Sequence, residues 1–249
     1  MPKRHDGRRV DELRSLAFEL HYTRWAEGSV LAKFGQTHVL CNVTVEEKLP
    51  PWLKAQGSQQ GWLTAEYALL PRSTQQRVDR EQRWPKGRTQ EISRLVGRSL
   101  RMAVDLRKLG PRQLIVDCDV LQADGGTRTA AITGAWLAVV LAICPLVRRG
   151  LIPATVLKRQ VAAISVGVVN GQPMLDLDYP EDAQAEVDLN VVMTGEGAFV
   201  EVQGTAEGEP FPRPQLDALL LLAHQGIERL LAEQLAALAA ATHSIPNAR

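Results

Sequence analysis

Apolar and polar residues alternate along the first part of the chain with the period of two that is typical of β-strands. Three such stretches cover residues 18–23, 29–34 and 38–45, and the short joints between them contain Gly28 and Gly35. Short glycine-containing joints favour antiparallel hairpins. Two further extended segments are expected at residues 61–67 and 114–120.

Helical spacing of apolar residues predicts three helices. The first runs from Thr89 to about Arg107, with Thr89 as a plausible N-cap, and the third starts at Pro214, since proline is favoured at the first helical position. The second covers residues 130–143 and is apolar almost all round, which indicates a helix buried within the domain. The segment after it, residues 145–153, is interpreted as a connector.

Two more hairpins are predicted in the second half of the chain. Asn170-Gly171 separates strands at 161–169 and 173–178, and such a dipeptide is a strong hairpin signal. Asp176 and Asp178 should then share one face of the strand at 173–178. A second pair of strands, at 187–194 and 198–203, flanks residues 195–197.

This order of strands and helices predicts the α+β class, with mixed or antiparallel sheets packed on helices. No Pro/Gly-rich linker divides the chain, so residues 1–240 are interpreted as one domain and 241–249 as a flexible tail. The basic and polar residues 1–14 are interpreted as an arm.

Composition narrows the class of protein. The net charge is only +1, no signal-peptide pattern is present, and nowhere do about eighteen apolar residues run together. We therefore expect a soluble cytoplasmic protein that does not enter membranes. The three cysteines form no C-x-x-C motif and the five histidines have no ligand spacing, so buried free thiols and the absence of zinc are expected.

The charges are unevenly distributed. Basic residues lie between 72 and 88, and acidic residues between 176 and 188. A basic and an acidic segment in one domain suggest one site, in which the basic segment holds phosphate and the acidic segment holds a metal ion or a proton. Trp84, within the basic segment, is interpreted as an anchor for its loop, with stacking on an RNA base as the alternative.

The joint Gly125-Gly126-Thr127-Arg128 follows a predicted strand and opens the apolar helix. Glycines allow a close approach of the backbone, and the free N–H groups and dipole of a helix start favour an anion. A simple tight turn is the alternative. A second helix start, at Gly87-Arg88, supports the phosphate interpretation, because Arg88 and Arg128 would clamp one phosphate if the two starts lay side by side.

Two carboxylates stand out among the acids. Asp182 and Asp188 lie before and at the start of a predicted strand, where side chains reach into clefts. Such a pair is able to hold Mg²⁺, or one member is able to protonate a leaving oxygen. The sequence leaves these roles open, and the neighbouring acids are expected to cap turns or face water.

Five segments, in order and over nearly the whole chain, resemble bacterial ribonuclease PH: Gly61–Thr74, Gly87–Arg101, Asp117–Trp136, Leu175–Gly195 and Phe199–Gly208. The resemblance implies a ribosomal protein S5 domain 2-like fold and a phosphorolytic 3′-to-5′ exoribonuclease, or tRNA nucleotidyltransferase. It also implies a homohexamer, a trimer of dimers, acting on tRNA precursors and other structured RNA with single-stranded 3′ tails. Inorganic phosphate would be the co-substrate, and nucleoside 5′-diphosphates the products.

The resemblance assigns the residues as well. The phosphate site falls on Arg88, Gly126, Thr127 and Arg128, the two active-site aspartates on Asp182 and Asp188, and the RNA-binding arginines on Arg72, Arg77 and Arg80. Two alternatives remain open: a hydrolytic metal-dependent ribonuclease, and a catalytically silent RNA-binding subunit of a ring.

Overall fold

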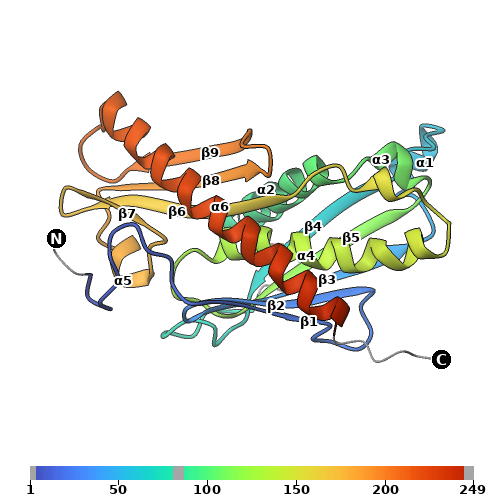
Figure 1. The fold of residues 1–249 in the computed structure, drawn as a ribbon, viewed down its shortest axis with the longest axis horizontal. Coiled ribbons are helices and arrows are strands. Elements are labelled where there is room, and N and C mark those ends of the chain that lie inside the picture. Colours follow the sequence, from blue (N-terminus) through green and yellow to red (C-terminus); the bar gives the residue numbers. More distant parts are fainter. Residues whose placement is uncertain (1–3, 81–86, 244–249) are drawn as a thin grey trace.

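A computed structural model describes residues 4–80 and 87–243 of the chain (Figure 1). The predictions for Trp84 and for the end of the tail, residues 244–249, lie outside this part. The strands are β1 (Leu16–Leu20), β2 (Gly28–Phe34), β3 (Thr37–Glu46), β4 (Trp62–Leu69), β5 (Gln113–Gln122), β6 (Val161–Val169), β7 (Gln172–Leu175), β8 (Val187–Thr194) and β9 (Phe199–Ala206). The helices are α1 (Pro51–Ala55), α2 (Gly87–Ala103), α3 (Leu106–Leu109), α4 (Thr127–Arg148), the 3₁₀ turn Ala154–Val156, α5 (Tyr179–Asp182) and α6 (Arg213–His243).

The strands form two sheets. The first has the order β1-β2-β3-β5-β4 and the second β7-β6-β8-β9. All neighbours are antiparallel except β4 and β5, which run parallel. The α+β class with mixed and antiparallel sheets is therefore confirmed, as are all three hairpin regions.

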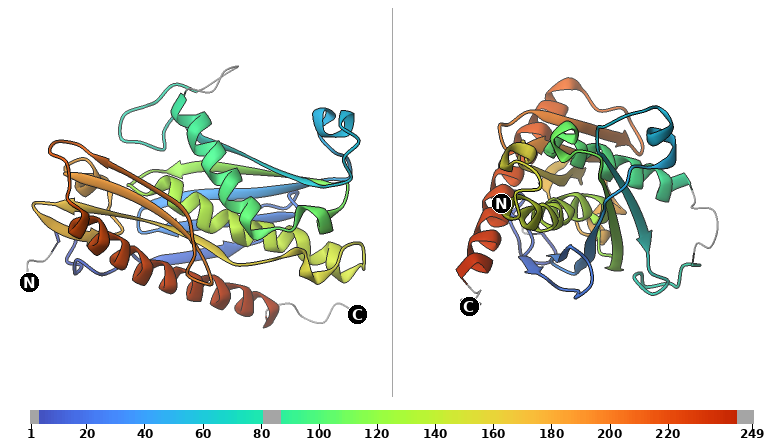
Figure 2. Two further views of the ribbon diagram at one scale, coloured as in Figure 1. Left: turned by 90° about the horizontal axis from the view of Figure 1, so that it is seen from above. Right: turned by 90° about the vertical axis from the view of Figure 1, so that its right-hand side faces the viewer.

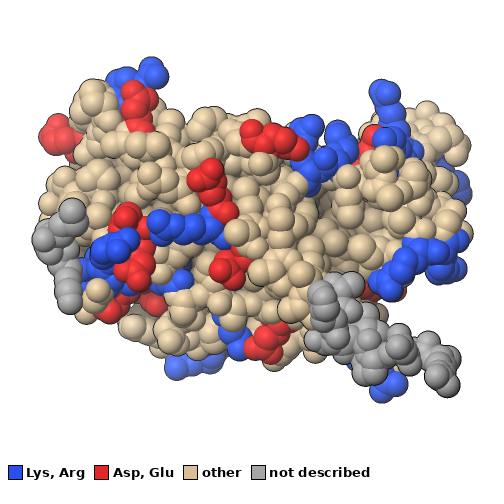
Figure 3. Space-filling model, in the orientation of Figure 1, with Lys and Arg blue, Asp and Glu red and all other residues tan. Residues whose placement is uncertain are grey.

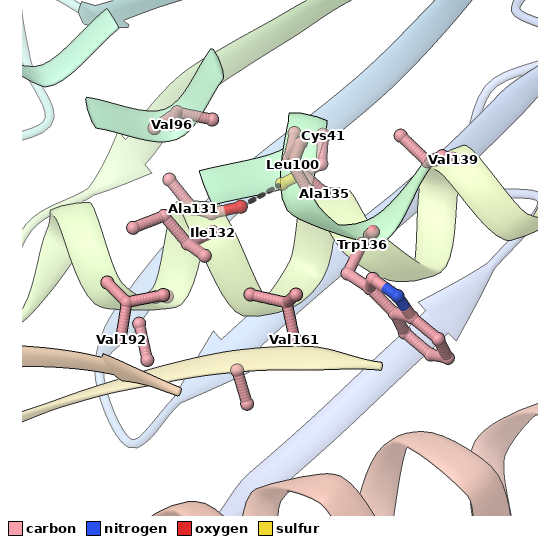
Figure 4. Packing of buried hydrophobic residues seen from close by; sticks show 14 of the residues in the cluster. Cys41, Val96, Leu100, Ala131, Ile132, Ala135, Trp136, Val139, Val161 and Val192 are labelled. Atoms are coloured by element: carbon pink, nitrogen blue, oxygen red, sulfur yellow. Dashed lines mark hydrogen bonds between the residues drawn. The ribbon is translucent and has the colours of Figure 1, made fainter. Parts of the chain in front are cut away.

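Helix α4 fills the centre of the molecule. It packs on β2 and β3 of the first sheet and on β6 of the second, which explains why its sequence is apolar on every side. Figure 4 shows this packing, with the Cys41 thiol donating to the carbonyl of Ala131. By length and composition α4 is apolar enough to cross a membrane, but 78% of its most apolar window is buried in protein. All three cysteines are free.

Two helix ends differ from the prediction. Helix α4 continues to Arg148 because Pro145 lies in its last turn, where its missing N–H removes a single bond. Helix α2 stops at Ala103 instead of Arg107, because the Asp105 side chain accepts from the N–H groups of Arg107 and Lys108 and starts α3. Helices α2 and α6 lie on opposite sides of the molecule (Figure 2), and α6 remains helical through residue 243.

From residue 4 onward the N-terminal segment packs against the rest of the protein, so its interpretation as an arm is wrong. Arg4, Arg8 and Arg14 are all buried. Arg4 pairs with Glu181, and Arg14 with Asp176 through two bonds of 2.7 and 3.1 Å. Buried guanidinium groups require such partners, because an uncompensated charge inside a protein is very costly. The segment therefore packs against the end of β7 in the second sheet and is part of the folded domain.

The acidic segment folds differently from its predicted strand. Strand β7 ends at Leu175, and Asp176 has a positive φ of 54° that turns the chain. Asp176 is fully buried against Arg14, while Asp178 caps α5 by accepting from the N–H of Glu181. These two acids do not share a strand face, because ion pairing and capping decide their directions.

On the face shown in Figure 3, acidic and basic side chains are interspersed.

Candidate active site

The candidate site lies where β4 and β5 end. Because the two strands are parallel, their carboxyl ends meet at one edge of the sheet, a common position for ligand sites. Beyond β5 the loop 123–126 leads into α4, and Ala123 N–H donates to the Ser73 carbonyl in the loop that follows β4. Two segments far apart in sequence thus meet at this edge.

Both glycines of the loop are required by its geometry. Gly125 and Gly126 have φ values of 73° and 62°, in the left-handed region that glycine tolerates best. A Cβ on Gly125 would lie 2.6 Å from the Leu177 carbonyl oxygen. Gly126 is the N-cap of α4 and brings no capping side chain, so the first-turn N–H groups are available to an anion.

A cavity of about 600 Å³ opens at this loop. All six residues predicted for catalysis and phosphate binding line it: Arg88, Gly126, Thr127, Arg128, Asp182 and Asp188. The starts of α2 and α4 therefore share one cavity with the two aspartates, which lie on α5 and β8. The segments that contribute these side chains are up to a hundred residues apart, and the fold brings them together.

Arg128 is held in place by polar neighbours. Its Nη1 donates to Gln203 Oε1 at 2.8 Å and approaches Glu91 Oε1 at 3.5 Å, while Gln203 itself donates to Glu91 at 3.1 Å. Only 17% of the Arg128 side chain is exposed, whereas Arg88 is exposed at the cavity mouth. Thr89, predicted as the N-cap of α2, lies instead inside its first turn.

Tyr67 adds a further contact from β4. Its hydroxyl shares a 2.8 Å hydrogen bond with Thr127 Oγ1, and burial raises the pKa of the phenol, an effect that Arg88 and Arg128 oppose. Tyr67 therefore fixes the hydroxyl of Thr127 at the first residue of α4. No local sequence pattern predicts this pairing, because the two residues are sixty positions apart.

The two aspartates have raised pKa values. Burial and the nearby Asp182 raise the pKa of Asp188 to about 6. Asp188 Oδ2 accepts from the Asn190 amide at 3.3 Å, and its Oδ1 is buried without a partner in the part of the chain that the structure describes. Desolvation by the cavity walls also raises the pKa of Asp182, but Arg88 and Arg128 oppose that change. Crowded carboxyl groups of this kind favour a shared cation or a shared proton.

The back of the loop is held by two residues that the sequence interpretation missed. Arg14 Nη1 donates to the Asp124 carbonyl at 2.5 Å and to the Gly125 carbonyl at 3.4 Å. Thr37 Oγ1 accepts from the Asp124 N–H at 3.0 Å and donates to the Gly125 carbonyl at 2.7 Å. With its carbonyls held from behind, the loop turns its helix-start N–H groups toward the cavity.

Replacing Arg14 by lysine should lower the free energy of unfolding by about 1–2 kcal/mol, since the forked bonds to Asp176 and the loop are lost while the charge remains. Urea denaturation measures this change. Arg9→Lys is the matched control, because Arg9 forms an exposed pair with Asp11, and such pairs contribute little. Equal stabilities of the two variants would contradict a loop-holding role for Arg14.

The three arginines expected to bind RNA do not line the cavity. Arg72, Arg77 and Arg80 lie exposed in the loop after β4, whose Thr74 does reach the cavity wall. Arg77 pairs with Asp79 at 3.0 Å, and Arg72 donates to the Gln75 carbonyl at 3.2 Å. Their role in RNA binding therefore stays a prediction.

A cluster of potential metal ligands also lies outside the cavity. His5, Asp178 and Glu181 have potential ligand atoms within 4.8 Å of one another. Arg4 already pairs with Glu181, and Arg8 lies 3.6 Å from both Asp178 and Glu181. These guanidinium groups supply the positive charge that a metal would bring, so the cluster stabilises the N-terminal segment.

Comparisons with known proteins agree with this geometry. Residues 12–145 match domain 1 of the 3′ exoribonuclease family, and residues 159–226 match its domain 2. A ribonuclease PH from Synechococcus elongatus is 55% identical over 235 residues, which cover 94% of this chain and 98% of the relative.

Solved structures share the fold. Rice Rrp46 has a TM-score of 0.75 and 19% identity, covering 95% of this chain and 100% of its own. The Archaeoglobus fulgidus exosome with RNA bound to the active site has a TM-score of 0.75 and 24% identity, covering 94% and 92% of the two chains. With two family domains in order and a relative more than half identical, the chain belongs to the ribonuclease PH family of phosphate-dependent 3′-to-5′ exoribonucleases.

Proposed function

We propose that this enzyme trims the 3′ tails of tRNA precursors in the cytoplasm, and that the cavity at the start of α4 is its active site. The observation that carries the proposal is that two arginines and two aspartates line one cavity. Arg88 and Arg128 line the same cavity as Asp182 and Asp188. Phosphorolysis needs this arrangement, because an anionic nucleophile has to approach an anionic phosphodiester.

In the proposed reaction, an oxygen of inorganic phosphate attacks the phosphorus of the last phosphodiester. The bond from that phosphorus to the 3′-oxygen of the preceding nucleotide breaks, a nucleoside 5′-diphosphate leaves, and the 3′-oxygen takes up a proton. Arg88, Arg128 and the N–H groups after Gly126 hold the attacking phosphate and offset its repulsion from the scissile group. In the reverse direction the same groups hold the terminal phosphate of a nucleoside diphosphate.

The aspartates fit a Mg²⁺ ion. Carboxylate oxygens suit this cation, and Asp188 Oδ1 is buried and unpartnered within the described residues, a position that a cation would compensate. When bound, Mg²⁺ would stabilise the negative charge that develops on the departing oxygen. Asp182 and Asp188 would hold it, and the raised pKa of Asp188 equally allows this carboxyl to deliver a proton to the 3′-oxygen.

Assembly into a homohexamer, a trimer of dimers, is part of the proposal. Phe199 and Val202 are exposed on β9, the edge strand of the second sheet, which is a surface suited to contact with another subunit. Light scattering of the purified protein measures the number of copies. A monomer at micromolar concentration would contradict this part, without bearing on the chemistry of the cavity.

The test of the activity uses a tRNA precursor with a short 3′ trailer, with and without inorganic phosphate. Trimming should require phosphate and release nucleoside 5′-diphosphates, and added nucleoside diphosphate should lengthen the RNA. A hydrolytic enzyme would continue without phosphate and release monophosphates, and a silent ring subunit would bind the RNA without converting it. An unstructured RNA of equal length is the control for substrate choice, and equal rates on both would remove the preference for tRNA precursors.

A further inference from the structure

Ser165 lies on β6 and takes part in no interaction that the mechanism above uses. Its residue is 3% exposed, it lines the cavity, and its Oγ has no hydrogen-bond partner among residues 4–80 and 87–243. Buried hydroxyl groups are nearly always paired, because an unpaired one loses its hydration without compensation. A buried, unpaired hydroxyl on the wall of a polar cavity indicates that its partner is the ligand.

The register of the second sheet fixes the direction of this side chain. Ser165 is paired with Asn190, and Gly167 with Asp188, so Ser165 shares a sheet face with Asp188 and Asn190 of β8. Ile164 and Val166, its neighbours along β6, are completely buried in the hydrophobic core on the opposite face. The hydroxyl therefore belongs to the polar side of the sheet.

That side faces the start of α4. A Cβ placed on Gly126 would lie 3.6 Å from Ser165 Oγ, so the serine hydroxyl is next to the N-cap glycine, whose following N–H groups are available. The amide of Asn190 already donates to Asp188 Oδ2. Neither Gly126 nor Asn190 forms a hydrogen bond with the Ser165 hydroxyl.

We infer that Ser165 is a further phosphate-binding residue, whose hydroxyl donates to the inorganic phosphate held at the start of α4. The inference rests on the proposed position of the active site. Arg88, Arg128 and the helix N–H groups reach the anion from the first sheet and its helices, and Ser165 reaches it from the second sheet. A tetrahedral anion with several acceptor oxygens accommodates such donors from two directions.

The contribution of Ser165 differs from that of the arginines. A neutral hydroxyl adds a directed hydrogen bond without adding charge, and it depends on phosphate being present at one position. Its loss should weaken binding of phosphate in the ground state and the transition state alike. Such a change raises KM and leaves kcat unaltered.

The test compares Ser165→Ala with Ser99→Ala in the full-length enzyme. Ser99 is a second buried serine with an unpartnered hydroxyl in the described part of the chain, but it lies on α2 and does not line the cavity. Ser165→Ala should raise the KM for phosphate roughly tenfold, as expected for the loss of one hydrogen bond to a charged group. The KM for RNA and the kcat at saturating phosphate should stay at wild-type values, and Ser99→Ala should leave all three unchanged.

A binding measurement without catalysis supports the kinetics. Added inorganic phosphate should raise the melting temperature of the wild type and of Ser99→Ala by similar amounts, and that of Ser165→Ala by less. If the alanine variant does not fold, Ser165→Cys keeps the side-chain volume with a weaker donor and should show the same direction of change.

The two proposals fail in distinguishable ways. Wild-type enzyme that trims RNA equally well without phosphate would overturn the proposed function. Phosphate-dependent wild type together with a Ser165→Ala variant of unchanged phosphate KM and unchanged thermal shift would overturn only the role of Ser165. A rise in KM for RNA as large as that for phosphate would also contradict it, since it would show a general distortion of the site.

Discussion

Asp188→Asn should lose RNA trimming by roughly a thousandfold while the protein without phosphate and metal becomes more stable than the wild type. The amide keeps the shape of the side chain but neither binds a cation strongly nor delivers a proton, so both proposed roles are lost. Asp182→Asn should lose turnover for the same reason. Product analysis on a 3′-tailed RNA measures the loss.

The gain in stability follows from the pKa of Asp188, which the fold raises from 3.8 to about 6. The native state therefore binds this proton more tightly than the unfolded state does. The resulting stabilisation is fully present below pH 3.8 and is lost as the pH rises through about 6. At neutral pH the charged carboxylate costs about 3 kcal/mol, and its replacement by an amide should raise the melting temperature by roughly 9 °C.

Thermal unfolding at pH 7.5 and at pH 4.5 tests the sign of this effect. The difference between Asp188→Asn and the wild type should be large at the higher pH and small at the lower one. Asp79→Asn is the control, because Asp79 is exposed in the loop after β4 and forms a surface pair with Arg77. Near-normal turnover of Asp188→Asn would remove this residue from the active site, whatever its stability.

Arg128→Ala should raise the phosphate concentration needed for half-maximal activity by roughly a hundredfold, with little change in RNA affinity. Its guanidinium is mostly buried in the cavity beside the helix start, where a charged donor acts without screening by water. Neither Gln203 nor Glu91, its present partners, is able to replace a cation. Steady-state kinetics with varied phosphate and varied RNA separate the two requirements.

Arg77→Ala is the matched comparison and should behave in the opposite way. Arg77 has 59% of its side chain exposed outside the cavity, and we propose that it contacts RNA phosphates. Its loss should raise the KM for RNA and lower the salt dependence of RNA binding by about one unit of slope. Equal effects of the two substitutions on phosphate and RNA would contradict this division of roles.

The sequence alone determined most of the local structure and several of the site residues. Period-two alternation located strands such as β3 and β6, and Asn170-Gly171 located the β6–β7 turn. The apolar character of residues 130–143 on all sides already required that α4 be buried. Strands and helices can be predicted in this way because side-chain directions repeat every two residues in a strand and every 3.6 in a helix. The pattern of residues close together in sequence is therefore enough to locate them.

Only the tertiary structure decided which distant groups meet. Arg14 and Asp176 are 162 positions apart, and no local pattern distinguishes their buried pair from solvated charges. The same holds for Ser165, which occurs in an apolar run. It becomes a candidate phosphate-binding residue only because the fold places it next to Gly126. Periodicity indicates which face of an element is buried, but the partner of a buried polar group depends on how two sheets and a helix pack, and that is a property of the whole chain.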